Sequence, residues 1–333
     1  MTKAKLGLGI IGCGRISFAH AEACQNLQDR VVIQAAADLD EAKLANFSEM
    51  TSLPNQFADY RQLLKQPDVE AVIICLPHVL HYPVAVDALR AGKHVLVEKP
   101  MALTYDQAMT MVTEADLASR VLMVGQSRRF SHAAIEMKRM VEDGEIGQLF
   151  RIIVNFLCFF EKAPTQWWND KHIAGASLVT VLQGSHAFDE ISWIFGRTPR
   201  CVYATSFTKN LHDDESDILL DYGDATAAVH LSLNTRPPLI HEVLAVGAHG
   251  VMKLSEWRDE KPFSYGYRFE VNSRTVVEGL QKPSIFTLQL EEFVASVTEN
   301  RRPVASGREI ASTTMRIMSA AVESAVSKKP VML

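Results

Sequence analysis

The sequence predicts an α/β protein in which a doubly wound parallel sheet is followed by an α+β domain with an open, mainly antiparallel sheet. Two patterns predict this fold class. Up to residue 125, short apolar runs alternate with amphipathic, helix-like segments, as in parallel sheets with crossover helices. Beyond that point, strand-like segments alternate apolar and polar residues and are joined by short links, as in an antiparallel meander.

The length and composition fit two globular domains. The chain has 333 residues, which is too long for one simple core. We expect the first domain to span residues 1–125 and the second to span residues 126–333. Hydrophobic residues make up 47% and charged residues 22% of the chain, as in ordinary globular proteins. The net charge of −5, without a basic block, argues against nucleic acid or an anionic membrane as a partner.

The sequence also lacks targeting and metal-binding patterns. No apolar run approaches the ~18 residues that span a bilayer, and the amino terminus has no signal-peptide pattern. The five cysteines are scattered and never spaced Cys-x-x-Cys, which disfavours disulfides and a structural zinc site. We therefore expect a cytoplasmic protein without a bound metal.

The first apolar run leads into a glycine turn that fits a dinucleotide. Leu6 to Ile11 is continuous and apolar, as in a strand buried on both faces, and a helix-like segment follows the turn. Gly12 permits the tight turn, and Gly14 lets the backbone approach a pyrophosphate at the helix amino terminus. The third fingerprint position is Ser17. This pattern predicts a Rossmann domain whose turn residues contact the cofactor: Gly12, Gly14, Arg15 and Ile16.

A second apolar run, Val31 to Ala37, ends at Asp38, about 20 residues after the fingerprint. A carboxylate at this distance binds the adenosine ribose hydroxyls and repels a 2′-phosphate. Asp38 therefore predicts NAD in preference to NADP. The alternative is that Asp38 caps the helix predicted to begin at Glu41.

Two later strands also end in polar or turn-forming residues. Ala71 to Cys75 is followed by Leu76 and Pro77, and His94 to Val97 is followed by Glu98-Lys99-Pro100. Ligands of open α/β sheets bind at the carboxyl ends of the strands. Glu98 and Lys99 are therefore candidates for chemistry, and the alternative is a turn with two solvated charges.

Several motifs resemble the glucose–fructose oxidoreductase/inositol dehydrogenase/MocA (Gfo/Idh/MocA) family. They are Gly12-x-Gly14-x-x-Ser17-x-x-His20, Leu76-Pro77-x-x-x-His81, Gly92-Lys93-His94 before Glu98-Lys99-Pro100, Arg129-Phe130, Gly144-x-Ile146-Gly147, Gly184-x-His186-x-x-Asp189 and the segment Phe293 to Gly307. The resemblance implies a Rossmann domain followed by an α+β domain that is often used for oligomerisation. It also implies oxidation or reduction of sugars, polyols or related compounds with NAD or NADP.

The resemblance further implies roles for individual residues. Lys99 and His186 correspond to the usual catalytic groups. Glu98 is expected to contact the nicotinamide ribose or to hold Lys99, and Lys99-Pro100 is a candidate cis peptide. The late helices, Phe286–Glu299 and Arg308–Lys328, are expected to pack back near the Rossmann domain. The expected cofactor contacts beyond the glycine turn are Asp38, Leu76, Pro77, His81, Glu98 and Lys99.

The second domain is expected to hold the substrate. Ser177 to Phe195 is predicted to be helical and to carry His186. The adjacent Trp167 and Trp168 are either buried packing or a platform for the apolar face of a sugar. Asp213-Asp214-Glu215 is predicted to be a solvated loop. The expected substrate contacts are Arg129, Trp167, Trp168, Gln183 and Asp189.

An exposed sheet face in this domain would need a cover, so we expect a homodimer or homotetramer. One departure from the family pattern concerns catalysis, because an aspartate commonly precedes the histidine by four residues and Leu182 stands there. Thr180 or Gln183 could take its place. The leading hypothesis is a sugar or polyol dehydrogenase. The alternatives are a non-catalytic dinucleotide-binding regulator of the galactose-repressor type and an NAD-dependent glycosidase.

Overall fold

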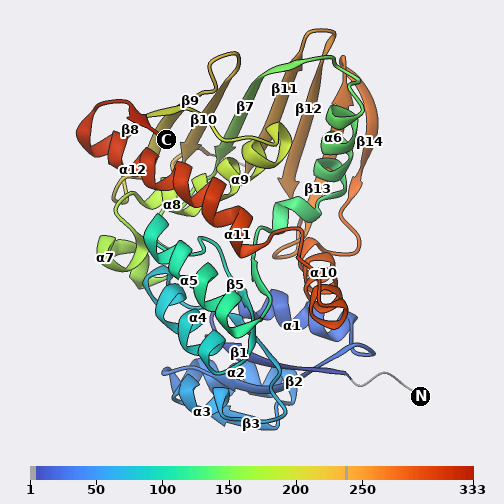
Figure 1. Cartoon of the computed structure of the whole chain (residues 1–333), viewed down its shortest axis with the longest axis vertical. Helices are drawn as coiled ribbons and strands as arrows, with labels where there is room; N and C mark the ends of the chain where they lie inside the picture. Colours follow the sequence, from blue (N-terminus) through green and yellow to red (C-terminus); the bar gives the residue numbers. More distant parts are fainter. Residues whose placement is uncertain (1–4, 237–238) are drawn as a thin grey trace. The chain divides into compact units, whose positions relative to one another are not determined.

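The computed structural model describes residues 5–236 and 239–333, which form two compact units (Figure 1). The first unit runs up to Ser127 and includes a later segment, Pro283–Ala311. The second unit consists of Arg128–Lys282 and Ser312–Leu333. The chain therefore returns to the first unit at Pro283 and enters the second unit again at Ser312.

The first unit is built on a six-stranded sheet in the order β3-β2-β1-β4-β5-β6. All of its strand pairs are parallel, and β1 is buried along its whole length. The strand order reverses between β1 and β4, which is where doubly wound sheets bind ligands. The strands are β1 (Leu6–Ile11), β2 (Val31–Ala37), β3 (Asn55–Phe57), β4 (Ala71–Ile74), β5 (His94–Val97) and β6 (Leu122–Val124).

Helices connect these strands, and several begin at polar caps that the sequence contains. The side chain of Thr104 accepts a hydrogen bond from the backbone N–H of Gln107, as predicted for a capping box. The late helix α10 packs against α1 within this unit (Figure 1). The helices of the unit are α1 (Ser17–Asn26), α2 (Glu41–Thr51), α3 (Tyr60–Leu64), α4 (His81–Arg90), α5 (Tyr105–Ala118), α10 (Ile285–Glu299) and α11 (Gly307–Ile310).

The second unit is built on a nine-stranded sheet in the order β14-β13-β12-β11-β7-β10-β9-β8-β15. Only the β7–β10 pair is parallel, so the predicted open and mainly antiparallel sheet is confirmed. The strands are β7 (Leu149–Leu157), β8 (Cys201–Phe207), β9 (Glu215–Asp221), β10 (Thr226–Ser232), β11 (Ile240–Gly247), β12 (Gly250–Arg258), β13 (Tyr265–Val271), β14 (Arg274–Leu280) and β15 (Val331–Met332).

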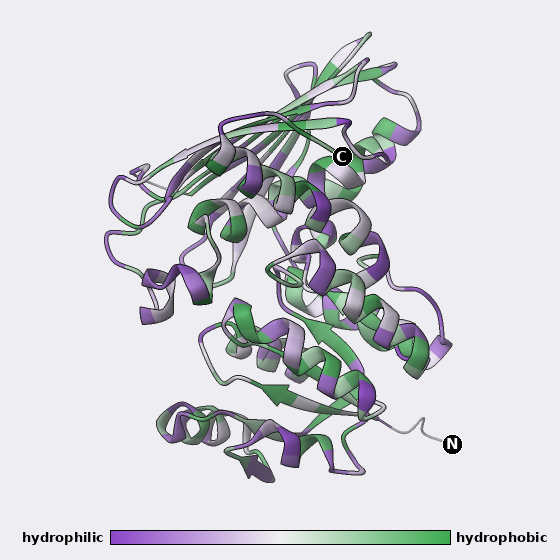
Figure 2. Cartoon of the chain, turned by 60° about the vertical axis from the view of Figure 1, so that its left-hand side comes forward, coloured by the Kyte–Doolittle hydropathy of each residue, from purple (hydrophilic) through white to green (hydrophobic). Residues whose placement is uncertain are grey.

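Hydrophobic and hydrophilic residues alternate along these strands (Figure 2), and helices cover one face of the sheet. These helices are α6 (His132–Glu142), α8 (Leu178–Leu182), α9 (Gly184–Phe195) and α12 (Arg316–Ser327). The segment predicted to be helical, Ser177 to Phe195, contains two helices, because α8 ends at Leu182 and α9 begins at Gly184. Some large apolar side chains of the sheet are exposed, among them Phe207, Leu219 and Val276.

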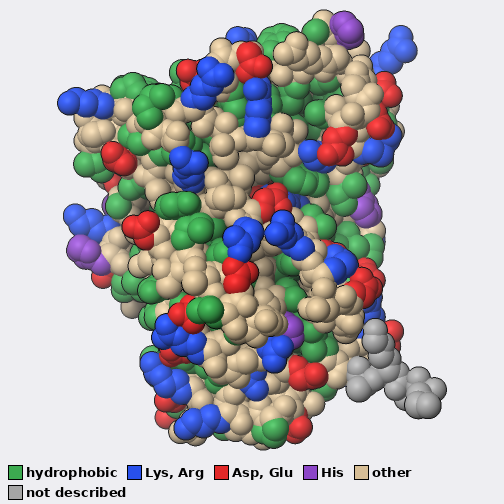
Figure 3. All heavy atoms as spheres, viewed as in Figure 1, with side chains coloured by type: hydrophobic (Ala, Val, Ile, Leu, Met, Phe, Trp, Pro, Cys, Tyr) green, Lys and Arg blue, Asp and Glu red, His purple; other side chains and the backbone are tan. Residues whose placement is uncertain are grey.

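The molecular surface shows charges of both signs. Lysine, arginine, aspartate and glutamate side chains are interspersed over the face in Figure 3, without a continuous basic patch. In the described part of the chain, no helix is both long and apolar enough to cross a bilayer.

Candidate functional site

The glycine turn after β1 has the shape that close approach of a ligand requires. Gly12 has a φ of +94°, and a Cβ there would lie 2.5 Å from the carbonyl oxygen of Cys75. A side chain at this position is therefore excluded. A Cβ on Gly14 would meet nothing within 4 Å, so the turn is open at this residue. The buried Ser17 hydroxyl donates a hydrogen bond of 2.6 Å to the Gly14 oxygen and closes the turn where α1 begins.

Asp38 joins the end of β2 to this turn. Its Oδ2 accepts a hydrogen bond of 2.7 Å from the Cys13 N–H, and its Oδ1 accepts one of 2.8 Å from the Asp40 N–H. The cap of α2 is Asp40, whose side chain accepts from Ala42 and Lys43. The helix-cap alternative for Asp38 is therefore wrong. Its half-buried carboxylate sits beside the glycine turn with lone pairs left for ribose hydroxyls.

The strand β5 delivers a buried carboxylate and a half-buried lysine at its carboxyl end. Glu98 is 8% exposed, and its Oε1 lies 2.8 Å from His20 Nε2. Its Oε2 accepts a hydrogen bond of 3.2 Å from the Lys99 backbone N–H. The solvated-turn alternative is therefore wrong for Glu98. The Lys99-Pro100 peptide is cis, as expected.

The ionised form of Glu98 is stabilised despite its burial. Burial alone raises the pKa of a carboxyl group. The hydrogen bond from His20, and the charges of His20, Lys99 and His81, outweigh burial and hold the pKa of Glu98 below its ordinary value. A carboxylate therefore lies next to Lys99.

His81 connects two turns at this edge of the sheet. Its Nδ1 lies 2.7 Å from the Pro100 carbonyl oxygen, and its Nε2 lies 2.8 Å from the Leu76 carbonyl oxygen. Both polar atoms of the ring are thus engaged with the backbone. The three turns after β1, β4 and β5 meet at neighbouring strand ends, which brings together most of the residues expected to bind the cofactor.

These residues fit an NAD molecule. The open Gly14, the amino terminus of α1 and the carboxylate of Asp38 match a pyrophosphate followed by a ribose. Leu76 and Pro77 are half-buried after β4, and Arg15 is exposed. NAD would supply the hydride acceptor or donor at this edge.

In the second unit, His186 lies on α9 and is half-buried. Its ring stacks on Phe156 of β7, with 6.0 Å between ring centroids. The Phe156 ring also contacts the ring of His241, with 4.7 Å between the ring centroids. His186 is therefore placed by a sheet strand as well as by its own helix.

The residues that could replace the family aspartate are all buried. The Thr180 hydroxyl accepts a hydrogen bond of 2.9 Å from Ser177, and Leu182 is packed in the core. Gln183 donates a hydrogen bond of 3.3 Å to Cys158, while its Oε1 has no partner among the described residues. Thr180 and Leu182 lie in α8, and Gln183 is the residue between α8 and α9.

Arg129 and Asp189, both expected to contact substrate, form a buried pair with each other. Two parallel hydrogen bonds of 2.9 and 2.8 Å join the guanidinium to the carboxylate. The Thr314 hydroxyl donates to the same carboxylate, and the guanidinium lies 5.6 Å from the Trp193 ring. The pair anchors α9 three residues after His186.

A second buried network lies beside this pair, and the sequence analysis missed it. His241 bridges Glu190 and Glu256, at 2.9 Å from each, and Glu256 also pairs with Arg128 and Ser131. Burial lowers the pKa of His241, but Glu190 and the hydrogen bonds to both carboxylates raise it to about 9. The only sequence pattern that could have suggested the network is the adjacent pairs Arg128-Arg129 and Asp189-Glu190.

The segments around Trp167-Trp168 and around Asp213-Asp214-Glu215 each contain a buried side chain. Trp168 is buried against Phe160, at 5.2 Å between ring centroids, whereas Trp167 is half-buried. The predicted solvated loop is wrong for Asp214, which is fully buried. Its carboxylate accepts hydrogen bonds from three backbone N–H groups, those of Lys209, Asn210 and Leu211.

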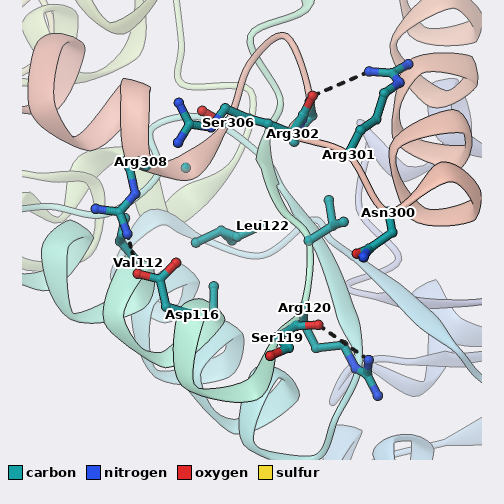
Figure 4. Close-up of a pocket in the computed structure, with 14 residues that line it drawn as sticks. Val112, Asp116, Ser119, Arg120, Leu122, Asn300, Arg301, Arg302, Ser306 and Arg308 are labelled. Atoms are coloured by element: carbon teal, nitrogen blue, oxygen red, sulfur yellow. Dashed lines mark hydrogen bonds and ion pairs between the residues drawn. The ribbon is translucent and has the colours of Figure 1, made fainter.

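A cavity of about 350 Å³ lies elsewhere in the first unit, beside the edge strand β6 (Figure 4). Four arginines line it, but Arg308 is directed to Asp116, and Arg301 is paired with Glu292. The cavity borders the beginning of β6, whereas the cofactor residues follow the strand ends. It therefore does not belong to the candidate site.

Within residues 5–236 and 239–333, no group of three or more His, Cys, Asp or Glu side chains is arranged to hold a metal ion. The five cysteines, all in the described part, are free thiols.

Comparison with known proteins identifies the family of the chain. Residues 6–126 match the oxidoreductase family with an NAD-binding Rossmann fold, and residues 134–253 match the GFO/IDH/MocA C-terminal domain. Trans-1,2-dihydrobenzene-1,2-diol dehydrogenase of Xenopus tropicalis is 26% identical over 321 residues, covering 87% of this chain and 95% of that protein. Myo-inositol 2-dehydrogenase of Thermotoga maritima is 32% identical over 141 residues, covering 42% of each chain.

Solved structures share the fold. Levoglucosan dehydrogenase in complex with NADH has a TM-score of 0.88 at 22% identity, with 99% of each chain covered. Aldose-aldose oxidoreductase from Caulobacter crescentus has a TM-score of 0.86 at 23% identity, covering 99% of this chain and 100% of that chain. The predicted fold, cofactor and resemblance are thereby confirmed. The chain belongs to the Gfo/Idh/MocA family and is an NAD-binding oxidoreductase.

Proposed function

We propose that the enzyme transfers a hydride between nicotinamide and a carbinol carbon of a polyol, sugar or cyclic diol. The observation that carries this proposal is Lys99, which follows β5 at the edge of the sheet where the glycine turn and Asp38 also lie. Support for the substrate class comes from the relatives, whose names specify a dihydrodiol, an inositol and an anhydrosugar.

The proposed chemistry of alcohol oxidation assigns one role to each catalytic side chain. The C–H bond of the carbinol breaks with transfer of hydride, and the O–H bond gives its proton to His186. Histidine suits this task because its ordinary pKa of about 6.5 lies near neutral pH. Lys99 donates a hydrogen bond to the same oxygen and stabilises the alkoxide charge as it develops.

We also propose roles for the other site residues. We assign cofactor contacts to the turn residues Gly12, Gly14, Arg15 and Ile16, to Asp38, and to Leu76 and Pro77. His81 and Glu98 support the turns, because their polar atoms are engaged with the protein. Arg129 and Asp189 position α9, since each is the other's partner. Contacts of substrate with Trp167, Trp168 and Gln183 stay predictions.

The exposed apolar side chains of the nine-stranded sheet support a further proposal, that a second copy of the chain covers this face. Phe207, Leu219 and Val276 would be buried by such a homodimer, or by a homotetramer. Five free cysteines support a reducing, cytoplasmic location. Light scattering of the purified chain measures its mass in solution, and the mass of one chain would contradict the assembly.

The test of function begins with a screen of myo-inositol, aldoses and cyclic trans-diols for NADH formation at 340 nm. Lys99→Ala should then lower turnover about 100-fold or more, because the hydrogen bond it donates strengthens in the transition state. NAD binding, measured by calorimetry, should persist. Release of nitrophenol from nitrophenyl glycosides without net NADH would instead indicate an NAD-dependent glycosidase.

Lys93 is a matched control for Lys99, because it lies just before β5 whereas Lys99 lies just after it. Lys93 donates hydrogen bonds of 3.0 and 2.6 Å to the carbonyl oxygens of Gln66 and Val69, where the strands begin. Lys93→Ala should leave turnover close to that of the unsubstituted enzyme. Equal turnover in Lys99→Ala and Lys93→Ala would remove Lys99 from the mechanism.

A further inference from the structure

Two buried histidines hold the Glu98-Lys99-Pro100 turn from two different helices. His20 of α1 reaches Glu98 Oε1 at 2.8 Å. His81 of α4 reaches the Pro100 carbonyl oxygen at 2.7 Å and the Leu76 carbonyl oxygen at 2.8 Å. Both rings are almost completely buried, at 0% and 1% exposure, so neither is available to bind a ligand from solvent.

We propose that His20 and His81 are positioning residues that fix Lys99 for hydride transfer, one through the carboxylate before it and one through the carbonyl after it. We call the pair the histidine clamp. This inference rests on the proposed role of Lys99. It deepens that role, because it explains how a long and flexible side chain is aimed from a rigid base.

The contact between His20 and Glu98 is suited to this role because no other hydrogen bond of the ring in the described part of the chain competes with it. The ring packs edge-on against Phe286 of α10, with 5.5 Å between ring centroids. Its Nδ1 has no hydrogen-bond partner among the described residues, so Glu98 is the polar partner that orients the ring. To donate to an ionised Glu98, His20 carries its proton on Nε2.

The charge of Glu98 depends on this contact. The groups that face its carboxylate are His20, Lys99, His81 and the Cys75 thiol. Of these, His20 provides the side-chain hydrogen bond. Without it, less would oppose the effect of burial, so the pKa of Glu98 would rise and its charge would be easier to lose. Lys99 would then lose an anionic neighbour as well as a fixed backbone.

The His81 contact restrains the backbone on the other side of Lys99. A neutral imidazole has one N–H and can donate to only one of the two carbonyls at a time. Burial lowers the pKa of His81, while the two carbonyls and Glu98 act in the opposite direction. Both turns are therefore held most firmly when the ring is protonated, which is at acidic pH.

The first experiment compares His20→Leu with His20→Gln. Leucine keeps the volume of the ring but cannot donate to Glu98, whereas the glutamine amide reaches the position of the imidazole Nε2. With the polyol that the screen identifies, His20→Leu should lower kcat about 10- to 100-fold, since a misplaced catalytic group costs about that much. The Kd of NAD should change little, and His20→Gln should recover most of kcat.

The pH profile separates positioning from general loss of structure. If Glu98 is protonated in His20→Leu, raising the pH ionises it again, so the ratio of wild-type to variant kcat should narrow between pH 6 and 9. His81→Leu should lower kcat similarly, and His81→Gln should recover part of it because an amide can donate to one carbonyl. A loss of kcat in His20→Leu that is independent of pH and persists in His20→Gln would overturn the inference.

A second readout needs no substrate. Trace labelling with acetic anhydride at pH 7, followed by peptide mass spectrometry, reports the fraction of Lys99 present as the free amine. Losing the Glu98 charge lowers the pKa of a neighbouring lysine, so Lys99 should label about threefold faster or more in His20→Leu. Unchanged labelling in His20→Leu would contradict the clamp even if no substrate had been found.

His94 supplies the control. It opens the same strand, and its Nδ1 accepts a hydrogen bond of 3.0 Å from the Val121 N–H at the end remote from Lys99. His94→Gln should change neither kcat nor the labelling of Lys99. If Lys99→Ala loses turnover while His20→Leu and His81→Leu keep it, the clamp is wrong and the proposed function stands. Unchanged turnover in Lys99→Ala would instead remove the proposed function.

Discussion

The two units both bury carboxylates near side chains proposed for catalysis, but they compensate the charge differently. In the first unit, Glu98 accepts hydrogen bonds from His20 and from the Lys99 backbone N–H, and the charges of Lys99 and His81 also stabilise it. In the second unit, three buried carboxylates are matched by three cationic groups: Asp189 pairs with Arg129, and Glu190 and Glu256 pair with His241 and Arg128.

We attribute this difference to function: Glu98 lies beside the proposed catalytic Lys99, whereas the buried carboxylates of the second unit hold structural elements in place. With His241 protonated, these six groups are neutral overall, and two of the carboxylates, Asp189 and Glu190, lie on α9, the helix that carries His186. Glu98 instead accepts a side-chain hydrogen bond from His20 and adjoins Lys99. We therefore expect changes in the second unit to act mainly on stability, and changes at Glu98 to act mainly on turnover.

The largest stability effect should come from breaking the Arg129–Asp189 pair. Arg129→Met would leave the buried carboxylate of Asp189 without its bidentate partner, which typically costs about 3–5 kcal/mol. Urea unfolding monitored by tryptophan fluorescence measures this cost. The double variant Arg129→Met/Asp189→Leu should regain much of it, because no buried charge is left. A loss below about 1 kcal/mol in the single variant would contradict a structural role.

A smaller effect should follow from the titration of His241. Its pKa is raised to about 9 in the folded chain, against about 6.5 in the unfolded chain. The stabilisation is then fully present below pH 6.5 and is lost as the pH rises through about 9. The change is on the order of 3 kcal/mol over this interval.

The measurement compares unfolding of the unsubstituted chain with that of His241→Gln from pH 6 to pH 9.5. The difference in stability between the two should shrink as the pH rises, because glutamine does not titrate. A constant difference would mean that His241 is neutral in the folded protein. By contrast, the kcat of His20→Leu should approach that of the unsubstituted enzyme over the same range, since there the titrating group is Glu98.

Local patterns in the sequence were sufficient for the parts of the fold that depend on neighbouring residues. The buried strands of the first sheet, the glycine turn and the capping box at Thr104 all have short-range causes, and the structure confirms them. The edge strand β3 was not predicted, because its three residues are mostly exposed and have no apolar pattern. The break between α8 and α9 was not predicted because it is confined to Gln183, which is an ordinary helix former.

The candidate site was less predictable because side-chain partners are long-range. His20 stands in the motif that marks the family, but its partner Glu98 lies 78 residues away. His241 and Glu190 are separated by 51 residues, and neither is unusual in its local sequence. Arg129 and Asp189 were expected to meet a substrate, yet a buried charge is equally well satisfied by another residue of the same chain.

The smallest effect should come from an exposed ion pair, which tests whether burial is what distinguishes these networks. Arg268 of β13 makes two hydrogen bonds of 2.9 Å to Glu278 of β14, the same bidentate geometry as Arg129 and Asp189, but on the surface. Glu278→Gln should leave the urea midpoint close to that of the unsubstituted chain, and any difference should vanish in 1 M NaCl, because water and salt screen exposed charges. If it instead destabilised the chain as strongly as Arg129→Met, the cost would follow from the bidentate geometry and not from burial. Burial would then not explain why the ion pairs of the second unit stabilise the fold, because that explanation depends on the free-energy cost of leaving a charge unpaired away from water.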